Sequence, residues 1–304
     1  MITAVIRPWL RPLLGVLVAA AVVGAAASAI ALSGAPSPDA PTLVGPSIEA
    51  AVAGGPSSSA EATAQVRPPA ATVAGATRVG SRPPVVDHGP RTGNRVALTF
   101  DADMTDGMLR NLRAGRVKSY ANLRIVDLLE REQVPATFFL TGKWVERYPD
   151  LTRRLADNPR FELANHTYGH LAYTGDCYDL PRVPAKGMTE DAAKTFELIE
   201  PYGGRQTRYF RFPGLCHDAA ALSALAPLGL TVVDGDVVSG DPFATAWEPI
   251  VRAVLDNVRP GSVVIMHVTE ANAAMTDEAL PHILAGLRDR GLVPATLSEV
   301  LAAT

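Results

Sequence analysis

Titratable side chains follow directly after several apolar stretches of this sequence. The run 96–100 is followed by Asp101 and Asp103, one residue apart. His166 and His170 have the i, i+4 spacing that brings two imidazoles to one side of a helical turn, close enough to share one divalent ion. Two histidines with a nearby carboxylate are a common ligand set of hydrolytic metal sites, which keep positions open for water and substrate. The pattern predicts metal-assisted hydrolysis, with one aspartate as a ligand and the other as a proton acceptor.

Further candidates follow other apolar runs. They are Arg211, after 208–210; Asp234, Asp236 and Asp241, after 230–233; and His267, after 262–266. Each has an ordinary interpretation on its own, since an aspartate can cap a helix and His267 can be a core histidine bonded to backbone. Position 167 is Thr rather than Glu, so the histidine pair is not the helix motif of zinc proteases. Five apolar segments that each end in a titratable group favour one shared site.

The elements that must position these residues alternate along the chain. We expect strands at 95–100, 136–142, 161–166, 208–212, 230–234, 262–268 and 292–296. Helical patterns lie at 120–133, 148–158, 189–202, 218–229, 246–258 and 277–291. This alternation predicts a largely parallel sheet covered by helices, and seven strands favour a closed or nearly closed barrel over a doubly wound open sheet. In either architecture the carboxyl ends of the strands share one rim, where the titratable residues would meet.

The first ninety residues differ in composition from the rest. Residues 1–32 carry two arginines and then an uncharged apolar run, which indicates either a cleaved signal peptide or an N-terminal membrane anchor. Residues 33–90 are rich in Pro, Ala, Gly and Ser, and we expect a flexible linker there. The folded domain is then expected at 91–304. The protein would be exported, and it would contact a membrane only through 1–32.

Charge and composition exclude some partners. The chain has 304 residues, 47% of them hydrophobic, and a formal net charge of −3. Nucleic-acid binding is not expected, because it needs clustered Lys and Arg. Nucleotide binding has no support, since neither glycine-rich phosphate motif is present. We expect a monomer.

Taken in order, the segments TFDAD, HTYGH, RFPG, DVVSGD and VIMH resemble the polysaccharide deacetylase family with the NodB homology domain, carbohydrate esterase family 4. The resemblance covers about residues 95–302. It implies a distorted (β/α)7 barrel that removes N- or O-acetyl groups from polysaccharides with a divalent metal, commonly Zn²⁺, with Co²⁺ or Mn²⁺ as alternatives. It further implies that Asp101 is the general base, that His166 and His170 are metal ligands, that Arg211 orients the base and that His267 is the general acid.

Three positions depart from the family pattern. The usual first motif has adjacent aspartates, the second a ligand; here Ala102 takes that place, so that Asp103 would reach the ion through a backbone bulge, or two histidines and water would hold the ion. We favour Asp103. In the fourth motif the acid that supports His267 is Asp236 or Asp241. Gly214 stands where an aromatic residue is common, which would open the substrate groove.

Two cysteines, Cys177 and Cys216, are expected to form a disulfide, with two free thiols as the alternative. We expect the basic insertion at 103–122 to be a solvated face, with contact to an anionic glycan as the alternative. We expect an acetylated polysaccharide as substrate, with cell-wall peptidoglycan amino sugars first and chitin oligomers or acetylated xylan next. The alternatives are a catalytically impaired carbohydrate-binding or scaffold homologue, and a hydrolase of C–N bonds in small amides.

Overall fold

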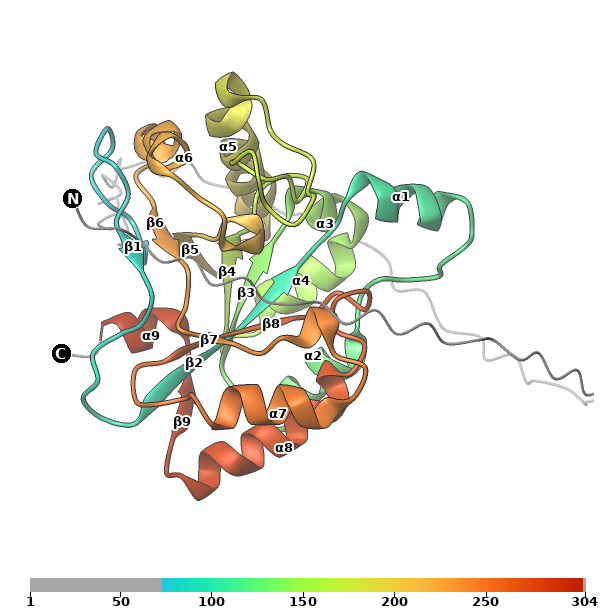
Figure 1. The fold of residues 1–304 in the computed structure, drawn as a ribbon, viewed down its shortest axis with the longest axis vertical. Helices are drawn as coiled ribbons and strands as arrows, with labels where there is room; N and C mark the ends of the chain where they lie inside the picture. Colours follow the sequence, from blue (N-terminus) through green and yellow to red (C-terminus); the bar gives the residue numbers. More distant parts are fainter. Residues whose placement is uncertain (1–72, 303–304) are drawn as a thin grey trace, which may run out of the picture. The chain divides into compact units, whose positions relative to one another are not determined.

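The computed structural model describes residues 73–302, which form a parallel sheet with helices around it (Figure 1). The strands are β1 (Val85–Val86), β2 (Arg95–Ala102), β3 (Ala136–Leu140), β4 (Phe161–Asn165), β5 (Arg205–Phe210), β6 (Thr231–Val233), β7 (Val237–Val238), β8 (Val263–His267) and β9 (Val293–Ala295). Their order is β1-β6-β5-β4-β3-β2-β8-β7, and β9 pairs with the first residues of β2. Every pairing between these strands is parallel.

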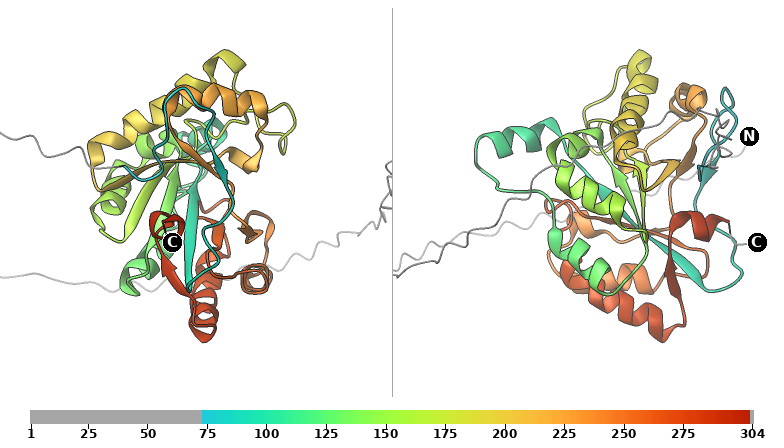
Figure 2. Two further views of the ribbon diagram at one scale, coloured as in Figure 1. Left: turned by 90° about the vertical axis from the view of Figure 1, so that its left-hand side faces the viewer. Right: turned by 180° about the vertical axis from the view of Figure 1, so that it is seen from behind.

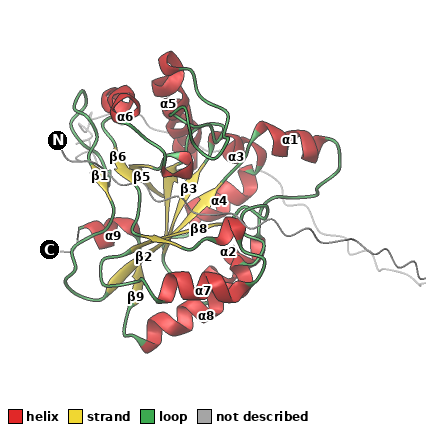
Figure 3. Ribbon diagram, in the orientation of Figure 1, coloured by secondary structure: helices red, strands yellow, loops and turns green. Residues whose placement is uncertain are grey.

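Helices fill the connections between the strands (Figure 3). They are α1 (Asp106–Arg113), α2 (Leu123–Arg131), α3 (Gly142–Arg147), α4 (Pro149–Asp157), α5 (Met188–Ile199), α6 (Ala219–Leu225), α7 (Trp247–Leu255), α8 (Thr276–Asp289) and α9 (Leu297–Leu301). Helices α7 and α8 lie side by side, with α2 next to α8 (Figures 1 and 2). The expected alternation of strands and helices is therefore confirmed. No helix within residues 73–302 combines the length and apolar character needed to cross a bilayer.

The two faces of the sheet bury different layers. Val96, Leu98 and Phe100 of β2 belong to the largest apolar cluster, which also contains residues of α2, α7 and α8. Ala97 belongs to a separate cluster with residues of α9. Because side chains alternate between the faces of a strand, the odd-numbered residues of β2 point away from the α2, α7 and α8 layer. We call this side of the sheet the inner face.

The amino end of the inner face is covered by α9. A capping box starts this helix, in which Thr296 accepts from the Glu299 backbone while the Glu299 side chain accepts from the Thr296 backbone. Its first amides donate to side chains near the starts of β3 and β4, Leu297 to Thr137 and Ser298 to Glu162. The carboxyl end of the inner face carries polar side chains instead.

The sheet is curled and is open between β1 and β7, which stand at the two ends of the strand order, and this agrees with the expected distorted barrel. The structure differs from the expectation in where the folded unit begins. Residues 73–90, expected in the linker, lie against the folded unit: β1 pairs with β6, and the Thr77 and Gly89 amides donate to the carbonyls of Gly229 and Gly261. The edge strand β1 has only two residues, too few for a periodic pattern. The expected signal or anchor at 1–32, and most of the expected linker, fall outside the described residues.

Candidate active site

One carboxylate and two imidazoles converge beyond the carboxyl end of β2. His166 Nε2 lies 3.3 Å from Asp103 Oδ1, and His170 Nε2 lies 3.4 Å from the same oxygen. One ligand atom from each residue lies within 4.8 Å of the others, the closeness needed to bind one ion. Asp103 Oδ1 is buried without a hydrogen-bond partner. A buried anionic oxygen without a donor is costly, and a divalent cation would satisfy it. The three residues therefore fit a metal site.

The side chain of His166 is oriented as a metal ligand. Its Nδ1 lies 2.9 Å from the carbonyl oxygen of Arg211. Because a carbonyl only accepts, Nδ1 carries a proton, and Nε2 is the ring nitrogen that faces Asp103 and can bind an ion. Burial would lower the pKa of His166, but the charges of Asp101 and Asp103 raise it, so an ion would displace a proton from Nε2 as it binds. Burial lowers the pKa of His170, which favours the neutral form that binds metal. Burial alone would raise the pKa of Asp103, but its interactions with His170, His166 and His267 lower it, so this carboxylate is ionised.

A left-handed turn, and not a helical turn, brings the two histidines together. Thr167 and His170 have φ values of 70° and 56°, and the centres of the His166 and His170 rings lie 5.1 Å apart. The turn is held by Asn165, whose side chain accepts from the Thr167 amide and donates to the Ala192 carbonyl. The i, i+4 spacing thus correctly predicted that the two histidines lie close together, but the chain between them forms a left-handed turn and not the expected helical turn.

No bulge is needed to bring Asp103 to the ion. The pairing of β2 runs without a register shift, through Ala102 with β3 and through Asp101 with β8. Asp101 and Asp103 are two residues apart in extended chain, so both side chains lie on the inner face. The sequence-based expectation of a backbone bulge is wrong for this reason.

Asp101 forms a buried ion pair with Arg211. The Arg211 Nη1 lies 2.6 Å from Asp101 Oδ1, and the guanidinium is fully buried. The Arg211 Nε donates to the Val233 carbonyl at 3.1 Å, and the guanidinium lies 4.0 Å from the centre of the Phe139 ring. Asp101 Oδ2 points to the metal-ligand side, 3.7 Å from His166 Nε2. The ion pair fixes Oδ1 against Arg211 and leaves Oδ2 as the oxygen that can accept a proton.

His267 lies next to Asp101 in the β2–β8 register and is held by Asp241. Asp241 Oδ1 lies 2.8 Å from His267 Nδ1, and Oδ2 accepts from the His267 amide and the Thr276 hydroxyl, each at 2.8 Å. Burial opposes protonation of this imidazole, but the Asp241 charge and hydrogen bond raise its pKa to about 9. His267 is therefore protonated at neutral pH and can donate a proton from Nε2, 3.9 Å from Asp103 Oδ2.

Asp236, the other acid expected to support His267, lies elsewhere. Its carboxylate contacts Arg91 at 2.6 Å and accepts from the Ser262 hydroxyl and the Val263 amide. These contacts are at the start of β8, whereas His267 ends that strand. The strand β7 separates the two acids, since it starts directly after Asp236 and ends before Asp241. The expected proximity of Asp236 to His267 is not found.

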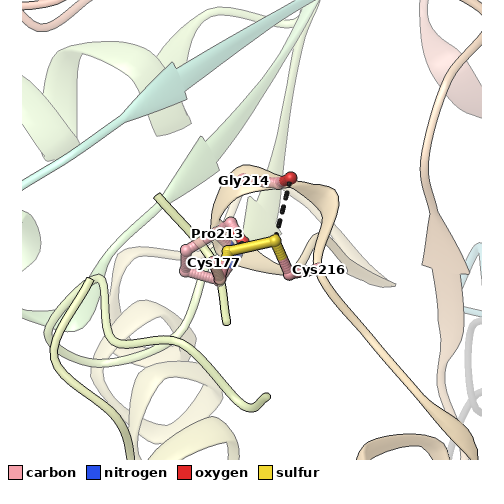
Figure 4. Close-up of a disulfide and its surroundings, with 4 residues drawn as sticks. All are labelled: Cys177, Pro213, Gly214 and Cys216. Atoms are coloured by element: carbon pink, nitrogen blue, oxygen red, sulfur yellow. Dashed lines mark hydrogen bonds between the residues drawn. A yellow bond between two sulfur atoms is a disulfide. The ribbon is translucent and has the colours of Figure 1, made fainter. Parts of the chain in front are cut away.

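The disulfide between Cys177 and Cys216 corrects the expectation for Gly214 (Figure 4). Gly214 has a φ of 61°, and an added Cβ would come within 2.8 Å of Cys177 Sγ and of the Tyr178 ring. The space of the missing side chain is therefore filled by the disulfide and by Tyr178, so glycine here does not open a groove. The alternative of two free thiols is excluded in this structure.

Two polar residues that sequence reasoning missed contact Asp103. The Asn272 side-chain amide donates to Asp103 Oδ2 at 2.5 Å. The Asp103 amide donates to Thr269 Oγ1 at 2.6 Å. Both residues lie in the loop between β8 and α8, far from Asp103 along the chain, and no spacing rule relates them to it.

The curled parallel sheet carries an Asp–His–His cluster that is flanked by a carboxylate–arginine pair and a carboxylate–histidine pair, which are the kinds of group that hydrolytic sites use. The sequence model of the family described as polysaccharide deacetylase matches residues 88–233. A chitooligosaccharide deacetylase of Bradyrhizobium sp. is 30% identical over 218 residues, which cover 67% of this chain and 90% of that protein. This chain belongs to the polysaccharide deacetylase family.

Other relatives show how far the similarity extends. A peptidoglycan-N-acetylglucosamine deacetylase of Bacillus cereus is 28% identical over 213 residues, 70% of each chain. An uncharacterized protein of Bacillus subtilis is 26% identical over 181 residues, which are 60% of this chain and 53% of that protein, so this chain spans about half of its length.

Two solved structures share the fold. One is a peptidoglycan N-acetylglucosamine deacetylase with a TM-score of 0.60 and 24% identity, covering 72% of this chain and 94% of the other. The second is a family 4 carbohydrate esterase pseudoenzyme of Bacillus anthracis, with a TM-score of 0.57 and 22% identity, covering 72% and 69%. The expected distorted (β/α)7 fold is confirmed.

Proposed function

We propose that this chain is a metal-dependent deacetylase that removes acetyl groups from N-acetylated amino sugars of cell-wall peptidoglycan. The observation that carries the proposal is the buried, unpartnered Asp103 Oδ1 facing the Nε2 atoms of His166 and His170. Two further groups flank this cluster. Asp101, which is paired with Arg211, is the proton acceptor, and His267, which is paired with Asp241, is the protonated imidazole. The set holds each group that hydrolysis of an acetamide requires.

The proposed ligands are Asp103, His166 and His170. A divalent ion bound there, Zn²⁺ in our proposal with Co²⁺ or Mn²⁺ as alternatives, would act as a Lewis acid that lowers the pKa of a water and polarises the acetyl carbonyl. Such an ion needs neutral imidazoles at His166 and His170 and an ionised Asp103, so its binding would displace a proton from a charged imidazole there.

The proton transfers are assigned to this chain's own side chains. Asp101 accepts the proton of the attacking water, and the buried Arg211 guanidinium holds its carboxylate in place. His267 donates a proton to the leaving amine, because Asp241 holds its imidazole in the protonated form.

Peptidoglycan is preferred as the substrate for two reasons. The relative from Bacillus cereus is named for N-acetylglucosamine of peptidoglycan, and the relative from Bradyrhizobium for chitooligosaccharide. Residues 1–32 have the composition of a signal peptide or membrane anchor, which would place the enzyme outside the cell next to its own wall. Fractionation of cells tests this location, since a chain confined to the cytoplasm contradicts it.

The function is tested by measuring acetate release. Purified chain is incubated with N-acetylated peptidoglycan, chito-oligosaccharides and acetylated xylan, each with Zn²⁺, with Co²⁺ or with a chelator. We expect metal-dependent release, fastest from peptidoglycan. Release that survives chelation would exclude the metal site, and binding of glycans without release from any of them would identify a catalytically impaired homologue.

A further inference from the structure

We propose that Asn272 and Thr269, in the loop between β8 and α8, are positioning residues that hold Asp103 as a one-oxygen metal ligand. This inference rests on the proposed metal site and goes beyond it. It explains how an aspartate placed one residue later than in the usual motif is fixed for an ion.

The backbone of Asp103 has no strand partner of the ordinary kind. The β2–β8 register ends with Asp101 opposite His267, and the Val268 amide still donates to the Asp101 carbonyl. At Asp103 a side chain makes the backbone hydrogen bonds that a neighbouring strand would otherwise make. The Asp103 amide donates to Thr269 Oγ1 at 2.6 Å, and the Thr269 hydroxyl donates to the Asp103 carbonyl at 3.2 Å. One buried hydroxyl therefore satisfies both backbone groups of the ligand residue.

The side chain of Asp103 is fixed by Asn272. The Asn272 amide donates to Oδ2 at 2.5 Å, which leaves Oδ1 as the oxygen that faces His166 and His170. A carboxylate with one oxygen occupied by a donor presents only the other to an ion. Hydrogen bonds to a ligand from neighbouring residues orient it and are needed for metal affinity.

The loop that carries both residues is itself anchored by the insertion after β2. Thr269 and Ala121 form an antiparallel bridge, and the Glu270 amide donates to the Tyr120 carbonyl. The Asn122 amide group donates to the Ala273 carbonyl at 3.2 Å. The end of the insertion at 103–122 thus supports the loop, which follows directly after His267. Metal binding and the general acid are therefore held by one segment.

The test measures metal affinity separately from activity. Zn²⁺ is titrated calorimetrically into the purified, metal-free full-length chain and into variants whose folding is checked by circular dichroism. We expect Asn272→Ala to weaken Zn²⁺ binding about 10- to 100-fold. The matched control is Asn257→Ala, because the exposed Asn257 side chain donates to the Ala253 carbonyl of α7 and lies in another part of the chain from Asp103. This control should keep the affinity of the unsubstituted chain.

A second pair of variants separates the hydroxyl from the packing of residue 269. Thr269→Ser keeps the hydroxyl and should retain Zn²⁺ affinity, whereas Thr269→Val keeps the shape and should lose it. Unchanged affinity in both Asn272→Ala and Thr269→Val overturns the inference even if acetate is released. Weakened affinity in a chain that never releases acetate would support the inference while refuting the proposed function. A chain that binds no Zn²⁺ overturns both.

Discussion

Replacement of Asp241 by Asn tests how the general acid is kept protonated. In the structure, burial lowers the pKa of His267, but the charge of Asp241, which is hydrogen-bonded to Nδ1, overrides burial and raises this pKa to about 9. Asn keeps the shape and can still accept from Nδ1, but it removes the charge. The pKa of His267 should then fall to its ordinary value near 6.5 or below.

The size of the effect follows from the protonated fraction. At pH 8, a group with a pKa of about 9 is roughly 90% protonated, and one with a pKa of about 6.5 is roughly 3% protonated, a difference of about 30-fold. At pH 6 the two fractions differ by less than about a factor of two. Activity that depends on protonated His267 is lost as the pH rises through the pKa of this group. Because that pKa is lower in the variant, the variant should lose activity at a lower pH. A bound cation repels the imidazolium, so the difference between the two proteins is the test.

The assay is the pH profile of kcat/KM for acetate release, together with an NMR titration of the His267 ring. The matched control is Asp236→Asn, because Asp236 pairs with Arg91 at the opposite end of β8. The control should keep the alkaline limb of the unsubstituted enzyme. An alkaline limb that does not move in Asp241→Asn, or that moves equally in the control, would refute the assignment of Asp241 as the supporting acid.

Three further changes have defined outcomes. Asp101→Asn should abolish acetate release while Zn²⁺ content is retained, and undiminished release would remove Asp101 as the base. Joint replacement of Cys177 and Cys216 by Ser opens a crosslink over 39 residues, which should cost about 4 kcal/mol in urea unfolding but leave turnover; loss of turnover in the folded variant would contradict a structural role. Gly214→Ala should lower the free energy of unfolding more than Gly240→Ala does. Both glycines have a positive φ, but an added Cβ would contact other atoms only at Gly214. Equal losses would show that the disulfide loop moves to make room for the Cβ.

The fold and much of the site follow from short-range features of the sequence. Apolar runs such as 96–100 mark the strands, and parallel strands place their carboxyl ends at one rim. Asp101 lies at the carboxyl end of β2 next to its last residue, Arg211 directly follows β5, and His267 ends β8. Strand assignment alone therefore brings these residues to the same edge of the sheet. Asp103 follows the same rule, because two-residue alternation puts it on the face of Asp101.

Other features depend on contacts that no local pattern records. Asp236 and Asp241 lie in one acidic stretch, and only the two-residue strand β7 between them decides which one reaches His267. Asn272 and Thr269 meet Asp103 across more than a hundred and sixty residues. A family motif anticipates an aromatic residue at Gly214, but the space is decided by a disulfide whose partner lies in another loop.

The most direct test of the central claim is anomalous diffraction at the zinc absorption edge from crystals of the chain grown with Zn²⁺. We predict one strong peak per chain, about 2.0–2.2 Å from Asp103 Oδ1 and from the Nε2 atoms of His166 and His170. A peak bound by other residues, or no peak at this cluster in crystals that hold zinc elsewhere, would contradict it.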